Sequence, residues 1–158
     1  RVYVDYFGKG EKKRDASIVL NALLFNEIYK KMYIERKRDS FMRQELEERI
    51  SILEQSGVIS KKVADYSRRA AELVLAEAED AAQEKMEMFI THLAMAGKRA
   101  EEGTEENPMD PEILESLREE PVYERAVRLR DRLLEETDLS FPEAEQDFLS
   151  VHICNLLS

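Results

Sequence analysis

The chain has 158 residues, enough for one domain with a sizeable core. Charged residues make up 37% of the chain, and it contains only five glycines and four prolines. This composition favours helices joined by short loops over an all-β fold. The net charge of −10 is uneven: residues 1–40 carry 10 basic and 6 acidic side chains, whereas residues 41–158 carry 14 basic and 28 acidic and should repel nucleic acid.

Residues 1–40 predict a basic leader that contains one helix. Residues 1–14 combine a short apolar run with glycines, which is typical of a strand stub from a missing neighbouring domain. From Asp15, a good N-cap, apolar residues recur at helical spacing and predict a helix to about Arg38. We therefore expect a fragment of a longer protein, with residues 1–40 as leader or linker and residues 41–158 as the main domain.

The first half of the main domain predicts three helices. One covers residues 46–53 and ends before Gly57, where a glycine can take the left-handed conformation of a helix end. The next starts after Ser60 and breaks near residues 76–82. The third runs from about Gln83 to Glu102 and stops at Gly103.

The second half begins with the clearest loop of the chain, GTEENPMDPE, which contains two prolines. A short helix around Ile113–Arg118 follows, and Pro121 is expected in the first turn of the next helix. The final helix starts after Ser140, with Pro142 in its first turn. The fold class is therefore all-α: a bundle of about five main helices, preceded by an extra N-terminal helix.

The two histidines of the chain occupy the same kind of position. His92 lies among apolar residues of one helix, and Arg99 follows it by seven residues on the same helical stripe. His152 lies among apolar residues of the last helix, and Glu145 precedes it by seven residues. Each ring therefore shares a stripe with one charged side chain.

Metal binding and catalysis find little support in these surroundings. The positions three and four residues from either histidine hold no second metal ligand. Cys154 lies two residues from His152 and points to another helix face, and no glycine-rich phosphate cradle or Gly-x-Ser-x-Gly turn occurs. We expect no enzyme, metal or cofactor, and a metal-dependent enzyme is the weakest of the alternatives.

Two roles remain for a half-buried imidazole. It can fill and hydrogen-bond the core, which is the more frequent outcome for a lone histidine on an apolar helix face. It can also accept a phosphoryl group, because a neutral ring nitrogen is a competent nucleophile at neutral pH. A dianion placed at a helix interface would then change how helices or subunits pack.

Three segments resemble the PTS regulation domain (PRD) of bacterial antiterminators and transcriptional activators. ITHLAMAGKR resembles its first histidine motif, FPEAEQDFLSVHI its second, and EEPVYERAVRL the segment between them. The matching residues are His92 and Arg99 in the first, Pro142, Glu145, Phe148 and His152 in the second, and Pro121, Tyr123 and Ala126 in between. Thr91, Gln146 and Asp147 depart from the usual pattern, since many members carry an acid at the first position and less polar residues at the other two.

The resemblance covers about residues 46–157 and implies a helical bundle that is often dimeric. It also implies that His92 and His152 accept phosphoryl groups from the phosphocarrier HPr or a sugar-specific IIB component of the phosphotransferase system. Arg99 and Glu145 would support the first and second histidine, respectively. Nucleic acid would be bound only by an attached effector domain.

These observations lead to one interpretation and a rival. The chain is interpreted as a phosphorylation-controlled module of a bacterial regulator of sugar-utilisation genes, a homodimer in the cytoplasm. The single cysteine, Cys154, suits a reducing compartment, and neither a membrane span nor a signal peptide is evident. The alternative is a non-catalytic dimerisation or scaffold domain with structural histidines.

Overall fold

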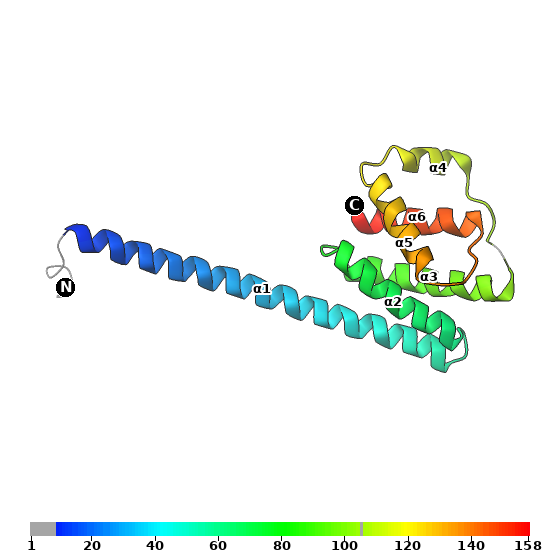
Figure 1. The fold of residues 1–158 in the computed structure, drawn as a ribbon, viewed down its shortest axis with the longest axis horizontal. Coiled ribbons are helices and arrows are strands. Elements are labelled where there is room, and N and C mark those ends of the chain that lie inside the picture. The colour runs from blue at the N-terminus through cyan, green and yellow to red at the C-terminus, as the bar shows by residue number, and fades with distance from the viewer. Residues whose placement is uncertain (1–8, 105) are drawn as a thin grey trace. The chain divides into compact units, whose positions relative to one another are not determined.

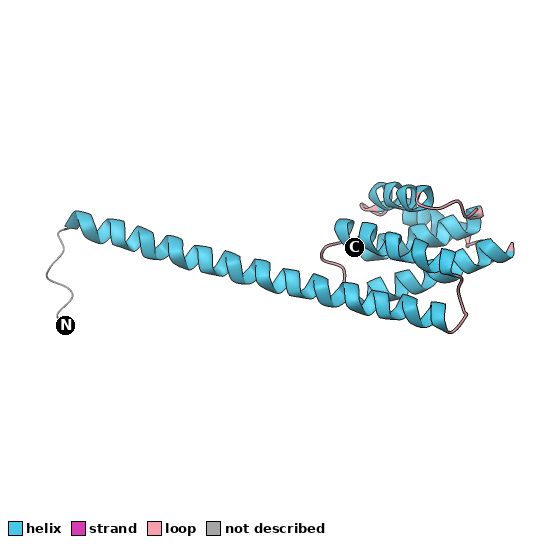
Figure 2. Cartoon of the chain, turned by 60° about the horizontal axis from the view of Figure 1, so that its bottom comes forward, coloured by secondary structure: helices cyan, strands magenta, loops and turns pink. Residues whose placement is uncertain are grey.

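The computed structural model describes residues 9–104 and 106–158, and within them it contains six helices (Figure 1). They are α1 Lys9–Gln55, α2 Lys61–Glu77, α3 Gln83–Glu102, α4 Pro111–Arg118, α5 Tyr123–Glu135 and α6 Glu143–Leu157. Loops connect them, and no strand occurs in the described residues (Figure 2). The predicted all-α bundle with an extra N-terminal helix is confirmed.

Helix α1 joins two predicted helices into one. The sequence between Gly10 and Gly57 contains neither glycine nor proline, so nothing ends the helix near Arg38. At its end Gly57 takes a left-handed conformation, with φ of 72°, and its N–H bonds to the carbonyl of Glu54 at 3.0 Å. The predicted strand stub is wrong for residues 9–14, which are helical, and residues 1–8 lie outside the described residues.

The chain divides into two units between Phe41 and Met42. In the first unit the large apolar side chains described between Ile18 and Ile34 are exposed, as is Phe41. In residues 42–158 the buried apolar side chains form one core, to which the end of α1 and helices α2, α3, α5 and α6 contribute. Helix α4 has no buried residue and packs against this core through the partly buried Leu117. All of the buried residues that the structure describes belong to this second unit.

Close packing of α2 on α3 and α5 builds the centre of this core. Val63 packs against Gly97, where an added Cβ would lie 3.0 Å from the Val63 Cγ1 atom. Tyr66 is fully buried and donates its hydroxyl to the carbonyl of Leu133 at 3.0 Å. Burial raises the pKa of Tyr66, so the phenol stays protonated as a donor.

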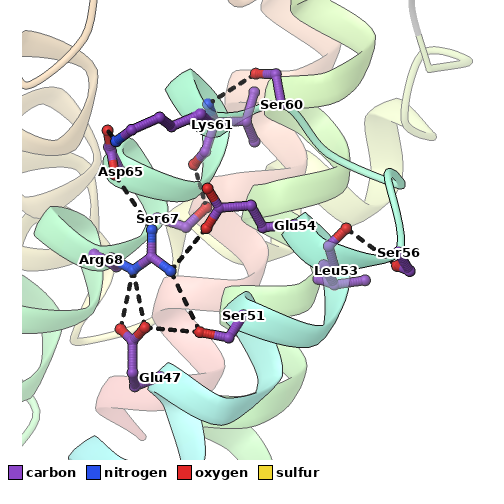
Figure 3. A network of polar contacts seen from close by, with 11 residues as sticks. Glu47, Ser51, Leu53, Glu54, Ser56, Ser60, Lys61, Asp65, Ser67 and Arg68 are labelled. Carbon is purple, nitrogen blue, oxygen red and sulfur yellow. Dashed lines mark hydrogen bonds and ion pairs between the residues drawn. The ribbon is translucent and has the colours of Figure 1, made fainter.

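Charged groups hold the last turns of α1 to α2 (Figure 3). The guanidinium of Arg68 donates to both carboxylate oxygens of Glu47, at 3.1 and 3.0 Å, and to Glu54 at 2.9 Å. The hydrogen bonds from Arg68 lower the pKa of Glu47. These groups are part-exposed, so together they contribute about 1 kcal/mol, and the apolar core remains the main source of stability.

The helix ends of the second unit follow the local sequence. Helix α3 ends at Gly103, which has φ of 66° as the predicted left-handed cap. The prediction for Pro121 is wrong, because α5 begins at Tyr123 with Val122 as its N-cap and the proline lies before both. The prediction that Pro142 lies in the first turn of the last helix is also wrong, because α6 begins at Glu143 and Pro142 is its N-cap.

Candidate functional site: a histidine pair between two antiparallel helices

Helices α3 and α6 bring the two histidines into direct contact. The rings of His92 and His152 stack with their centroids 4.2 Å apart and their planes 21° from parallel. We call this pair the histidine stack. The sequence placed each ring on its own helix stripe, and the fold places the two stripes face to face.

A second pair crosses the same interface. Arg99, two turns after His92, binds Glu145, two turns before His152, through both carboxylate oxygens. The guanidinium Nη2 donates to Oε2 at 3.0 Å, and Nε donates to Oε1. On α3 the histidine comes before the arginine, whereas on α6 the histidine comes after the glutamate, so the two helices are antiparallel. Because the spacing is seven residues on both helices, both pairs are in contact at once.

The histidine stack borders an open groove of about 570 Å³ that we call the histidine groove. Helices α3 and α6 and the segment from Glu106 to Ile113 form its walls. Its lining residues are His92, Ala96, Arg99, Glu106, Pro108, Met109, Asp110, Ile113, Glu145, Phe148, Leu149, Val151 and His152. The imidazoles are therefore reachable from solvent across a largely apolar surface.

The two rings differ in their environment. His92 is exposed, whereas His152 is half-buried. Burial, and to a smaller degree the neighbouring His92, lowers the pKa of His152 to about 4 from an ordinary 6.5. His152 is therefore neutral at pH 7, which leaves one ring nitrogen with a free lone pair.

The Arg99–Glu145 pair is the strongest electrostatic feature of the site. The side chain of Glu145 is only 1% exposed, and that of Arg99 is 25% exposed. The hydrogen bond from Arg99 to Glu145 raises the pKa of Arg99, although burial opposes the shift. Glu106 adds a weaker contact, 3.7 Å from the same guanidinium. The arginine is thus fixed by two carboxylates from different parts of the chain.

Two of the residues that depart from the resembled motifs, Thr91 and Gln146, have hydrogen-bond partners here. Thr91 donates to the carbonyl of Glu87 at 2.8 Å and accepts from Arg49 at 3.4 Å, while Arg49 pairs with the Glu87 carboxylate at 2.6 Å. Thr91, Glu87 and Arg49 thus form one polar contact between α1 and α3. The amide of Gln146 donates to the carbonyl of Phe141 at 2.8 Å, which ties the start of α6 to its loop.

Sequence reasoning found the four central residues but not how they combine. It assigned Arg99 to the first histidine and Glu145 to the second, whereas in the structure these two side chains bind each other. It also treated the proline-rich loop as a connection, although Glu106 and Met109 line the groove. Helical spacing carries no information about a loop, so no local signal could have placed these two residues.

The described residues contain neither a metal-binding cluster nor a membrane-spanning helix. Between residues 9 and 158, with residue 105 left aside, no group of three or more histidine, cysteine or acidic side chains is arranged to hold a metal ion. Within that same part of the chain, no helix has both the length and the apolar character needed to cross a bilayer.

The bundle, the histidine stack and the groove together define an all-helical domain with a paired-histidine site. Comparison of the sequence with protein families matches the PRD domain over residues 78–156, half of the chain. The chain therefore belongs to the PRD domain family, as the sequence motifs predicted. PRD domains are regulatory modules linked to the phosphotransferase system.

Among curated proteins the chain is similar to the uncharacterized protein YhfY of Escherichia coli strain K12. The two are 28% identical over 112 residues, which cover 70% of this chain and 93% of YhfY. No solved structure matches the chain.

Proposed function

We propose that this chain is a phosphorylation-controlled module of a bacterial transcription regulator of sugar-utilisation genes. His92 and His152 are the acceptors, and HPr or a sugar-specific IIB component is the donor. The observation that carries the proposal is the histidine stack at an open groove, within the matched family region. In the transfer, a ring nitrogen forms a bond to phosphorus while the bond between phosphorus and the donor's own side chain breaks, and the electron pair of that bond returns to the donor side chain.

Arg99 links phosphorylation to helix packing in this proposal. A phosphoryl group brings about two negative charges and three strong acceptor oxygens, which compete with Glu145 for the guanidinium. Side chains on a helix lean toward its N-terminus, so Arg99 leans toward His92. If Arg99 moves to the phosphoryl group, Glu145 is left buried without its cation, at a cost of several kcal/mol. Relief of that cost requires α6 to shift against α3.

The larger assembly follows from the same proposal. A shift between α3 and α6 would be transmitted through a homodimer to an attached effector domain, which alone would bind nucleic acid. The excess of acidic residues in residues 41–158 supports this division, because such a surface repels phosphate backbones. The proposed location is the cytoplasm, where the phosphotransferase proteins operate.

Phosphotransfer in vitro tests the proposal. The protein is incubated with phosphoenolpyruvate, enzyme I, HPr and IIB components from the bacterium that encodes it, and acid-labile phosphate is mapped by mass spectrometry. We expect label on His92 or His152 and none in the His92→Asn/His152→Asn variant. Absence of label on both residues, with donors shown to be phosphorylated, would reject the proposed function.

A structural role for the histidines is the second candidate, and the neutral, half-buried His152 favours it. On that view the stack only fills the helix interface. His152→Asp would then lower the free energy of unfolding by about 1–3 kcal/mol, as a partly buried unpaired charge does, while His92→Asp at the exposed ring would change it little, and neither would have any other effect. The regulatory function instead requires that these variants change dimerisation or reporter output while remaining folded.

A further inference from the structure

We propose that the histidine stack accepts one phosphoryl group per chain, so that a phosphoryl group on either ring excludes a second one on the other. This inference rests on the proposed function and concerns how the same site is regulated. It makes the pair a single two-position acceptor rather than two independent switches.

The spacing of the rings is the first reason. At 4.2 Å between centroids the imidazoles are in contact, with their planes nearly parallel. A phosphoryl group is bonded in the plane of its ring, so groups on the same edge of the stack would be separated by little more than the ring spacing. Each carries about two negative charges, which makes their repulsion about four times that of two single charges at the same distance.

The charges of the groove are the second reason. Among its described lining residues Arg99 is the only arginine or lysine, whereas Glu106, Asp110 and Glu145 supply three carboxylates. One phosphoryl group can take Arg99 from its carboxylate partners, but a second finds no lining cation left. Lys85 lies on the same stripe of α3, outside the groove lining, where its ammonium donates to the carbonyl of Asn155 at 2.8 Å.

The exposure of the two rings determines which histidine is phosphorylated first. Because His92 is exposed and His152 is half-buried, a docked donor protein reaches His92 first. Once His92 carries the group, the stack protects His152 from a second transfer. Direct passage of the group between stacked rings is disfavoured, because phosphoryl transfer needs attacking and leaving atoms in line and the in-plane lone pairs of parallel rings do not face each other.

Counting phosphoryl groups on the intact protein tests the inference. We would treat the full chain with potassium phosphoramidate, a small chemical donor, and separately with the enzymatic donors. Intact masses are recorded at alkaline pH for the wild type, His92→Asn, His152→Asn and the double variant. Phosphoramidate loses ammonia as the new P–N bond forms, and the proton on the other ring nitrogen passes to water, so no protein partner is needed.

Mutual exclusion predicts one added phosphoryl group on the wild type and one on each single variant. For two independent sites, the fraction of wild-type molecules with two phosphoryl groups would equal the product of the fractions labelled at each site. Mutual exclusion predicts a doubly labelled fraction about tenfold or more below that product, and this ratio measures the coupling between the sites. His152 should label more in His92→Asn than in the wild type, and far-ultraviolet circular dichroism would confirm that the variants are helical.

Three results would overturn the inference, and they differ in what they say of the proposed function. If the doubly labelled fraction of the wild type equals the product of the two single-site fractions, the sites are independent. That result rejects the exclusion but leaves both histidines as acceptors. Label on one histidine alone in every variant shows a single acceptor instead of a coupled pair. No label from phosphoramidate rejects the two-position acceptor. A single phosphoryl group from phosphoramidate on the wild type, with none from the enzymatic donors, supports the exclusion and rejects the proposed donors.

Discussion

At the scale of single residues, folding lowers the pKa of His152 in the candidate site. Its pKa is about 4 in the folded chain and 6.5 when the ring is free in water. Between these values the unfolded chain binds more protons than the folded one. The free energy of unfolding therefore rises with pH from about 4 to 6.5, and the contribution of His152 is fully present above 6.5.

The first prediction concerns this pH dependence. A fully buried ring with this shift would contribute about 3 kcal/mol, and the partial solvent access of His152 reduces that to about 1–2 kcal/mol. Urea titrations at pH 4.5 and pH 7.5 measure it, with His152→Asn as the control because asparagine does not titrate. The wild type should lose more stability at the lower pH than the variant, and equal losses would show that the ring titrates normally.

The second prediction concerns Arg99 and Glu145. Arg99→Leu leaves the buried Glu145 without its cation and should lower the free energy of unfolding by about 2–4 kcal/mol at neutral pH. The double variant Arg99→Leu/Glu145→Leu removes both charges and should recover most of that loss. Chemical denaturation of the three proteins measures the coupling. Additive losses in the double variant would mean that the pair does not act as a unit.

At the scale of helices, most of the fold could be predicted from capping residues and apolar spacing. The end of α3 at Gly103 and the break between α2 and α3 follow from local signals of this kind. Apolar spacing alone predicted two helices where the structure has the single helix α1. The continuity of α1 follows from the absence of glycine and proline between Gly10 and Gly57, which apolar spacing does not register. Likewise, the pairing of Arg99 with Glu145 depends on the direction in which α3 and α6 pack, which spacing along one helix does not specify.

The third prediction tests how α2 and α3 pack. Gly97 lets the two helices approach, and an added Cβ would lie 3.0 Å from Val63 Cγ1. Gly97→Leu should lower the free energy of unfolding by about 1–3 kcal/mol through overpacking. Adding Val63→Ala should restore part of the loss by making room, as thermal denaturation would show. A double variant less stable than Gly97→Leu would place the strain elsewhere.

At the scale of the whole molecule, the core and the site both lie in residues 42–158. All of the buried residues that the structure describes fall in this unit, and so do both histidines. The fourth prediction is that residues 42–158 fold alone, with a cooperative thermal transition within about 5 °C of that of the full chain. A truncated protein without a cooperative transition would show that residues 1–41 contribute to the core.

The most direct test of the account is nuclear magnetic resonance of the imidazole nitrogens. The chain has only two histidines, so nitrogen-15-labelled histidine gives two ring systems, and His152→Asn assigns them. On addition of phosphorylated HPr or IIB, we predict that a ring nitrogen signal of His92 shifts and couples to phosphorus. Unchanged spectra of both rings while the donors remain phosphorylated would contradict the account.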